Sequence, residues 1–121
     1  MTRTTLLDAL RAYLNAWNAP TVDARLSLLY QAVTDDVVYA DPHAPSRVEG
    51  RVGLAALMDS FRARYAHTLL PTAEPQHHHG IVRLPWRLAA SEADVLSTGL
   101  LVADSAPDGR LRWIAHFVDA A

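Results

Sequence analysis

The sequence predicts a single α+β domain made of three helices followed by an antiparallel meander of strands. Apolar residues recur at helical spacing in three segments of the first half and alternate with polar residues in the second half. Short turns separate the later segments, and consecutive strands joined by short turns pair antiparallel. The 121 residues suffice for one domain with one core. We therefore expect residues 1–121 to form one unit.

The helix boundaries follow from caps and breakers. The first helix should begin near Thr4 or Thr5, with Asp8 close to the positive end of its dipole. It should end at Asn18-Ala19-Pro20, because Pro cannot continue a helix. Thr21 can cap a second helix, and a third follows Gly50. Their apolar faces contain Val22, Leu26, Leu29 and Val33 in the second helix, and Leu54, Leu57, Met58, Phe61 and Tyr65 in the third.

The strand boundaries follow from β-branched residues and turns. We expect Thr34-Asp35-Asp36 to be a break and Val37-Val38-Tyr39 to be a short strand that ends before the loop marked by Pro42 and Pro45. Pro107-Asp108-Gly109 predicts a turn between the last two strands. The four strands of the second half are expected near residues 70–76, 81–89, 95–103 and 111–118.

Composition limits the classes of partner. The net charge of −2 argues against nucleic acid, whose binding requires clustered positive charge. The absence of Cys excludes disulfides, thiolate nucleophiles and Cys-zinc sites. No apolar run approaches membrane length, and the N-terminus has an amphipathic helix pattern rather than a signal peptide. We expect a cytoplasmic protein without a membrane partner.

Asp41 is the first candidate for chemistry. It follows an apolar strand and precedes Pro42, which places a carboxylate at the rim of an apolar interior. Desolvation raises the pKa of a carboxyl group, which suits general acid or base catalysis near neutral pH. The alternative is a turn aspartate that is solvated or bonded to nearby backbone N–H groups.

Three other side chains could share that interior. Tyr13 and Trp17 lie four residues apart on one helix face, where they are either ordinary core or part of a binding site. His116 shares a face of the last strand with Ile114, and is either a functional histidine or a satisfied core or surface one.

The run His77-His78-His79 does not predict a metal site. Adjacent strand residues point to opposite faces, so at most two of the three imidazoles converge, whereas zinc usually requires three or four ligands. Trp86 lies on an alternating apolar face with Leu84 and Leu88.

The order and spacing of several segments resemble the SnoaL-like proteins of the nuclear transport factor 2-like superfamily. These segments are residues 13–18 (YLNAWN), 35–42 (DDVVYADP), 48–54 (VEGRVGL), 86–88 (WRL) and 108–111 (DGRL).

The resemblance implies a cone, in which helices pack into a strongly curved antiparallel sheet that encloses a pocket, and often a homodimer. The superfamily includes ketosteroid isomerases, polyketide cyclases, hydrolases and non-catalytic binding domains. Tyr13 matches the tyrosine donor of the ketosteroid isomerases and Asp41 matches their base. Leu101 occupies the position of their second donor aspartate, and His116 is turned into the cavity near Asp41.

The resemblance and the residues together lead to two hypotheses. In the first, the protein binds a small, largely apolar molecule without a cofactor and acts on it as an isomerase, cyclase or hydrolase. Asp41 is then the base, His116 its partner or the acid, and Tyr13 polarises a ligand oxygen. The expected walls are Trp17, Tyr39, Phe61, Leu84, Trp86, Leu101 and Ile114.

The second hypothesis is a non-catalytic dimeric module that binds a ligand or a protein, and a purely structural dimerisation domain is a third option. In each case we expect a homodimer, because Trp113 and Phe117 lie on the face of the last strand opposite His116 and would otherwise meet water.

Overall fold

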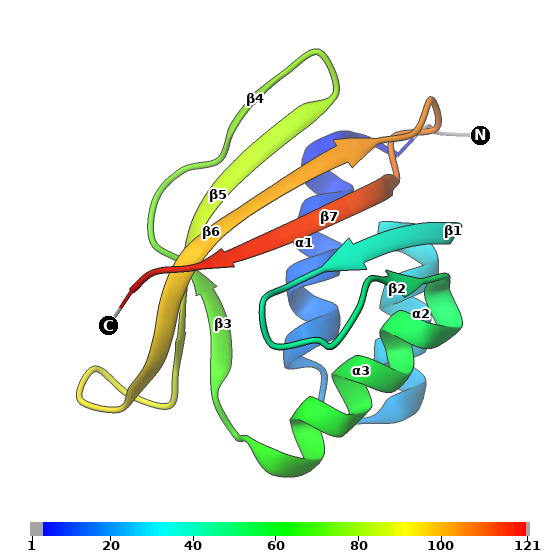
Figure 1. Cartoon of the computed structure of the whole chain (residues 1–121). Helices are drawn as coiled ribbons and strands as arrows, with labels where there is room; N and C mark the ends of the chain where they lie inside the picture. Colours follow the sequence, from blue (N-terminus) through cyan, green and yellow to red (C-terminus); the bar gives the residue numbers. More distant parts are fainter. Residues whose placement is uncertain (1–3, 121) are drawn as a thin grey trace.

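The computed structural model describes residues 4–120, and the ends of the predicted 1–121 domain lie outside them. Three helices lie on one side of a curved seven-stranded sheet (Figure 1). The helices are α1 (Leu6–Asn18), α2 (Val22–Ala32) and α3 (Arg51–Arg64). The strands are β1 (Val33–Ala40), β2 (Val48–Glu49), β3 (Thr68–Pro71), β4 (Gln76–His78), β5 (Ile81–Ala89), β6 (Val95–Ser105) and β7 (Leu111–Val118).

The sheet confirms the α+β class but is mixed rather than antiparallel throughout. Its strand order is β2-β1-β7-β6-β5-β3, with β4 paired to β5, so β2 and β3 end the path and the sheet does not close into a barrel. β5, β6 and β7 form the expected antiparallel meander. β1 runs parallel to β7, which corrects the prediction. A parallel neighbour needs a long connection, and the chain from α3 through β6 supplies it.

Both predicted N-terminal caps are confirmed. The side chain of Thr5 accepts a hydrogen bond from the Asp8 N–H at 3.1 Å, and Thr21 does the same for Ala24 at 3.1 Å. The buried Arg25 side chain then joins the three helices. It donates to the Ala19 carbonyl at the end of α1 and forms an ion pair with Asp59 of α3.

The predicted break at residues 34–36 is wrong, because α2 leads directly into β1 and the strand includes all three residues. Asp35 and Asp36 are exposed, so an extended backbone leaves both carboxylates solvated. The pairing of β1 with β7 is irregular between Val33 and Val38, where the acidic residues lie. The predicted strand at 70–76 is also wrong, since residues 72–75 separate β3 from β4.

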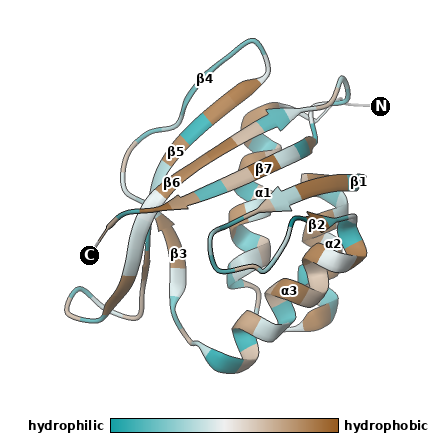
Figure 2. Cartoon of the chain, in the orientation of Figure 1, coloured by the Kyte–Doolittle hydropathy of each residue, from teal (hydrophilic) through white to brown (hydrophobic). Residues whose placement is uncertain are grey.

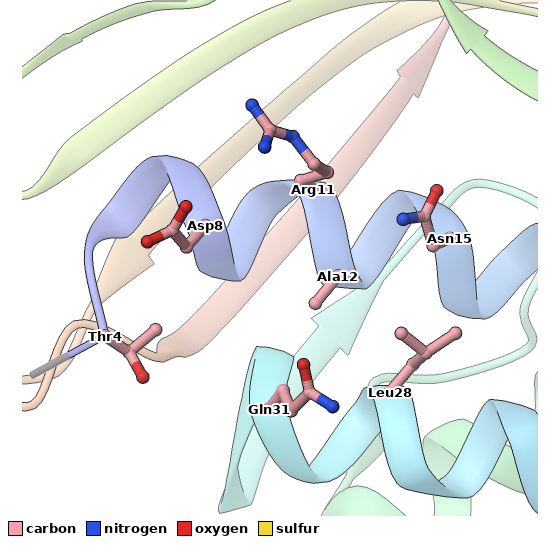
Figure 3. Close-up of a pocket in the computed structure, with 7 residues that line it drawn as sticks. All are labelled: Thr4, Asp8, Arg11, Ala12, Asn15, Leu28 and Gln31. Carbon is pink, nitrogen blue, oxygen red and sulfur yellow. The ribbon is translucent and has the colours of Figure 1, made fainter. Parts of the chain in front are cut away.

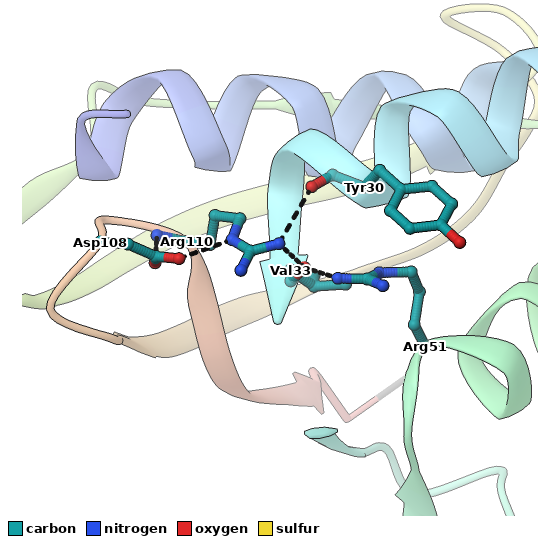
Figure 4. Close-up of polar contacts among 5 residues, drawn as sticks. All are labelled: Tyr30, Val33, Arg51, Asp108 and Arg110. Atoms are coloured by element: carbon teal, nitrogen blue, oxygen red, sulfur yellow. Dashed lines mark hydrogen bonds and ion pairs between the residues drawn. The ribbon is translucent and has the colours of Figure 1, made fainter. Parts of the chain in front are cut away.

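Two arginines from distant segments cap the junction of α2 and β1 (Figure 4). Arg51 donates to the Val33 carbonyl at 2.8 Å and lies over the Tyr30 ring at 4.3 Å. Arg110, bonded to Asp108 at 2.8 Å, donates to the Tyr30 carbonyl at 3.4 Å. α2 has no basic residue in its own last turn, and cations stabilise a helix C-terminus. These contacts fix the start of the strand whose other end carries Tyr39.

The core lies between the helices and the sheet. Figure 2 shows hydrophobic residues along the strands and helices, whereas the loop between β1 and β2 is largely hydrophilic. The largest fully buried side chains include Tyr13, Leu29, Leu54, Met58, Leu84, Leu101, Leu111 and Ile114. In the part of the chain that the structure describes, no helix has the length and apolarity to cross a membrane.

Candidate functional site

A cavity of about 550 Å³ lies among α1, α3, the β1–β2 loop and the sheet. Small-molecule sites typically have volumes of about 300–1,000 Å³. Six of the residues predicted from the sequence line it: Trp17, Tyr39, Asp41, Phe61, Trp86 and His116. The structure thus brings Asp41 and His116 to one cavity with mainly apolar walls. We name it the aromatic cavity after its aromatic side chains Trp17, Tyr39, Phe61, Tyr65 and Trp86.

Four other predicted residues do not line the aromatic cavity. Tyr13, Leu84, Leu101 and Ile114 are buried in the core behind it. Leu84 and Leu101 are directly paired between β5 and β6, and Leu101 is also paired with His116 of β7. These residues therefore support the cavity wall from behind.

Sequence reasoning did not assign the remaining lining residues to the site. Four of them, Leu57, Ser60, Arg64 and Tyr65, belong to α3 or directly follow it. Leu57 and Tyr65 lie on the apolar face predicted for this helix together with Phe61, and that shared face could have indicated them. The others come from the β1–β2 loop and the sheet: His43, Ala44, Pro45, Leu69, Leu88, Leu96, Ser97 and Val118. Leu88 lies on the alternating apolar face predicted for Trp86, whereas no motif indicated the loop residues.

Asp41 combines both roles considered for it, since it lines the cavity and also organises a turn. Its Oδ2 accepts a hydrogen bond from the Tyr39 hydroxyl at 2.5 Å. Its Oδ1 accepts from the backbone N–H groups of His43 at 2.7 Å and Ala44 at 2.8 Å. These three donors therefore hold the carboxylate in a fixed position at the cavity wall.

His116 lies at the centre of an aromatic cluster. Its Nε2 is 2.8 Å from the Tyr13 hydroxyl oxygen, and its ring centroid lies 5.5 Å from that of Trp86, 5.6 Å from that of Tyr39 and 6.4 Å from that of Trp17. Burial lowers the pKa of His116 to about 4, although the charge of Asp41 opposes this effect. The imidazole is therefore neutral at pH 7, and it can donate or accept a hydrogen bond but does not act as a cation.

The two buried phenols stay protonated. Burial is the largest cause that raises the pKa of Tyr13 and of Tyr39 above the usual tyrosine value, and the charge of Asp41 adds to it in both cases. The Tyr39 hydroxyl donates a hydrogen bond to Asp41, and the Tyr13 hydroxyl is hydrogen-bonded to His116. The site thus contains two tyrosine-anchored groups, one anionic and one neutral.

Gly99 makes room for the wall formed by Trp86. The two residues are directly paired between β5 and β6. A Cβ atom on Gly99 would lie 2.5 Å from Cζ2 of the Trp86 indole and 2.0 Å from the Phe117 carbonyl oxygen. Such distances are far below van der Waals contact, so only glycine lets the indole pack against β6.

Two other places in the chain were considered as possible sites: the histidine run that begins in β4 and a hollow between α1 and α2. His78 and His79 approach each other at 3.0 Å through their Nδ1 atoms, but residues 4–120 contain no group of three or more His, Cys, Asp or Glu that could hold a metal ion. A second hollow, of about 420 Å³, lies between α1 and α2 and is lined by Asp8, Arg11 and Gln31 among others (Figure 3). Asp8, Arg11 and Gln31 are all exposed, whereas Tyr39, Trp86 and His116 of the aromatic cavity are buried.

No family model and no curated protein sequence matches the chain. Solved structures do. A candidate isomerase of the SnoaL-like family from Agrobacterium tumefaciens is 28% identical, with a TM-score of 0.84 over 94% of this chain and 97% of that one.

Two more distant structures share the fold. A candidate SnoaL-like polyketide cyclase from Jannaschia sp. is 15% identical, with a TM-score of 0.76 over 97% of this chain and 87% of that one. A candidate ketosteroid isomerase from Kribbella flavida is 15% identical, with a TM-score of 0.73 over 98% and 81%. The chain therefore has the fold of the SnoaL-like proteins of the nuclear transport factor 2-like superfamily and is similar to them.

Proposed function

We propose that the protein binds a small, largely apolar molecule in the aromatic cavity and acts on it by acid–base chemistry, as an isomerase or a cyclase. The observation that carries this proposal is the Asp41 carboxylate, which three hydrogen bonds hold at the wall of a mainly apolar cavity. Support for the reaction type comes from the similar Agrobacterium structure, which is described as a candidate isomerase.

In this proposal Asp41 is the general base. Its carboxylate removes a proton from a carbon next to a carbonyl group, and the C–H electron pair moves into the carbonyl to form an enolate. The neutral imidazole of His116 stabilises the enolate oxygen by a hydrogen bond, as preorganised donors do. Where the enolate is conjugated with a C=C double bond, the protonated Asp41 returns the proton to the far carbon of that system, which completes an isomerisation. Alternatively, the enolate carbon attacks a second carbonyl, the electron pair of that C=O bond moves onto its oxygen, and this oxygen takes the proton from Asp41, which closes a ring.

Proton exchange tests this chemistry without knowledge of the natural substrate. A set of aromatic and alicyclic ketones is incubated with the protein in D₂O, and deuterium incorporation next to the carbonyl is followed by NMR. We expect catalysed incorporation for at least one ketone. Asp41→Asn should abolish it, because the amide keeps the shape of the side chain but cannot take up the proton.

The matched control is Asp36→Asn, since Asp36 is exposed on β1, the strand that leads to Asp41, and does not line the cavity. It should exchange at the wild-type rate. Equal loss in both variants, or full activity of Asp41→Asn, would contradict the role of Asp41. Binding of ketones with no exchange in the wild type would instead favour a non-catalytic binding module.

A further inference from the structure

We propose that Tyr13 holds His116 in the neutral tautomer protonated at Nδ1, so that this N–H is presented to an acceptor oxygen of the molecule in the aromatic cavity. Tyr13 is then a positioning residue that acts through His116 rather than on the ligand itself. The inference rests on the cavity of the proposed function, but not on whether turnover occurs.

The direction of the Tyr13–His116 hydrogen bond follows from the partners of the phenol. Tyr13 is fully buried, and among the described residues its hydroxyl has one acceptor within reach, Nε2 of His116 at 2.8 Å. If Nε2 carried the proton, the phenol O–H would have no acceptor, and a buried donor without a partner costs about 1–3 kcal/mol. The phenol therefore donates and Nε2 accepts.

Trp17 supports the same direction of the Tyr13–His116 hydrogen bond. Its indole makes no regular hydrogen bond to a described residue, yet it lowers the pKa of the Tyr13 hydroxyl, as a weak donor near that oxygen does. Because burial has the larger, opposite effect, the phenol keeps its proton. A phenol oxygen that accepts a weak hydrogen bond from Trp17 can still donate its O–H to Nε2 of His116.

The other imidazole nitrogen faces the cavity. The His116 ring lines the aromatic cavity, and its Nδ1 has no hydrogen-bond partner among the described residues. Nε1 of Trp86 is fully shielded from solvent and has no hydrogen-bond partner, but Nδ1 of His116 is not among the fully shielded atoms of this kind. Nδ1 is therefore accessible from the cavity. Since a neutral imidazole carries one proton and Nε2 accepts, the proton resides on Nδ1.

The groups around His116 keep it neutral. The titratable residues packed against it are Tyr13 from α1 and Tyr39 from β1, with Asp41 acting through its charge. Both phenols are uncharged, and Trp17 and Trp86 carry no charge. The cavity therefore presents a neutral donor beside an anionic base, which favours a ligand with a carbonyl oxygen and disfavours an anionic ligand close to Asp41.

The tautomer is measured directly on ligand-free protein by long-range ¹H–¹⁵N NMR with ¹⁵N-labelled histidine at pH 7. We expect the His116 signals, assigned by their loss in His116→Gln, to show a protonated Nδ1 and an unprotonated Nε2. Tyr13→Phe removes the donor and should shift His116 toward the Nε2-protonated form. The control Tyr30→Phe removes an exposed phenol on α2 and should change nothing. A protonated Nε2 in the wild type would overturn the proposal.

A pair of probes tests the donor role. Acetylnaphthalene carries a carbonyl oxygen, and ethylnaphthalene has a similar shape without an acceptor. We expect the ketone alone to shift the Nδ1 resonance, and Tyr13→Phe to weaken its binding about tenfold, the value of one net hydrogen bond, while ethylnaphthalene binding is unchanged. Equal effects on both probes would overturn the donor role. Failure of both to bind would contradict the proposed function, whereas the NMR of the ligand-free protein still decides the tautomer.

Discussion

Acidification should destabilise this fold through His116. Burial lowers the pKa of this histidine to about 4 in the folded protein, against 6.5 for an exposed one. Between these two pH values the unfolded chain binds a proton that the folded protein excludes. The contribution of neutral His116 to the free energy of unfolding is therefore complete above about pH 6.5 and is lost as the pH falls toward 4. Below pH 4 this group does not reduce the stability further.

The size of the effect follows from the two pKa values. One pKa unit corresponds to about 1.4 kcal/mol, so the full loss from this one group is roughly 3 kcal/mol. A domain of this size has a total stability of about 5–15 kcal/mol. The contribution is therefore large enough to shift a urea midpoint clearly.

Urea unfolding between pH 7.5 and pH 4 measures it, with His116→Gln as the test variant. Gln can still accept a hydrogen bond from Tyr13 but does not titrate. Because the other ionisable groups are common to both proteins, the wild type should lose roughly 3 kcal/mol more than the variant over this range. His77→Gln removes an exposed histidine of β4 and should behave as the wild type. Parallel stability curves for wild type and His116→Gln would refute the reasoning.

Three further predictions concern other parts of the molecule. Arg25→Ala removes a donor from the Ala16 and Ala19 carbonyls and the ion-pair partner of Asp59, and should cost about 3 kcal/mol in chemical denaturation, whereas the exposed Arg11→Ala should cost less than about 0.5 kcal/mol. Equal effects of the two substitutions would contradict the role of Arg25. Gly99→Ala should displace the Trp86 indole, with a changed tryptophan emission and a loss of about 1–3 kcal/mol; unchanged emission and stability would argue against this packing. We also propose that the protein forms a homodimer through the sheet face that exposes Trp113 and Phe117, with Phe117 58% exposed in the single chain. Light scattering at micromolar concentration should give the dimer mass, and Phe117→Glu should give the monomer; a wild-type monomer would refute it.

Local chemistry in the sequence determined much of the fold. The caps at Thr5 and Thr21 and the turn before β7 are short-range features, so the helix starts and the bounds of β5 and β7 agree with the structure. The pairing of Tyr39 with Asp41 is also local, because residues two apart on a strand point to the same side. The direction of β1 relative to β7 is not local, since it depends on where the intervening chain crosses the sheet.

The tertiary structure alone decided which apolar residues line the cavity and which fill the core. Ile114 and His116 share one face of β7, and Leu84 and Trp86 share one face of β5, so alternation cannot separate them. The curvature of the sheet and the position of α3 place His116 and Trp86 at the cavity and the other two behind it. Tyr13 and His116 are 103 residues apart, and only folding creates the hydrogen bond between them. Solvent exclusion then lowers the pKa of His116, because desolvation depends on everything packed around the ring rather than on its neighbours in the chain.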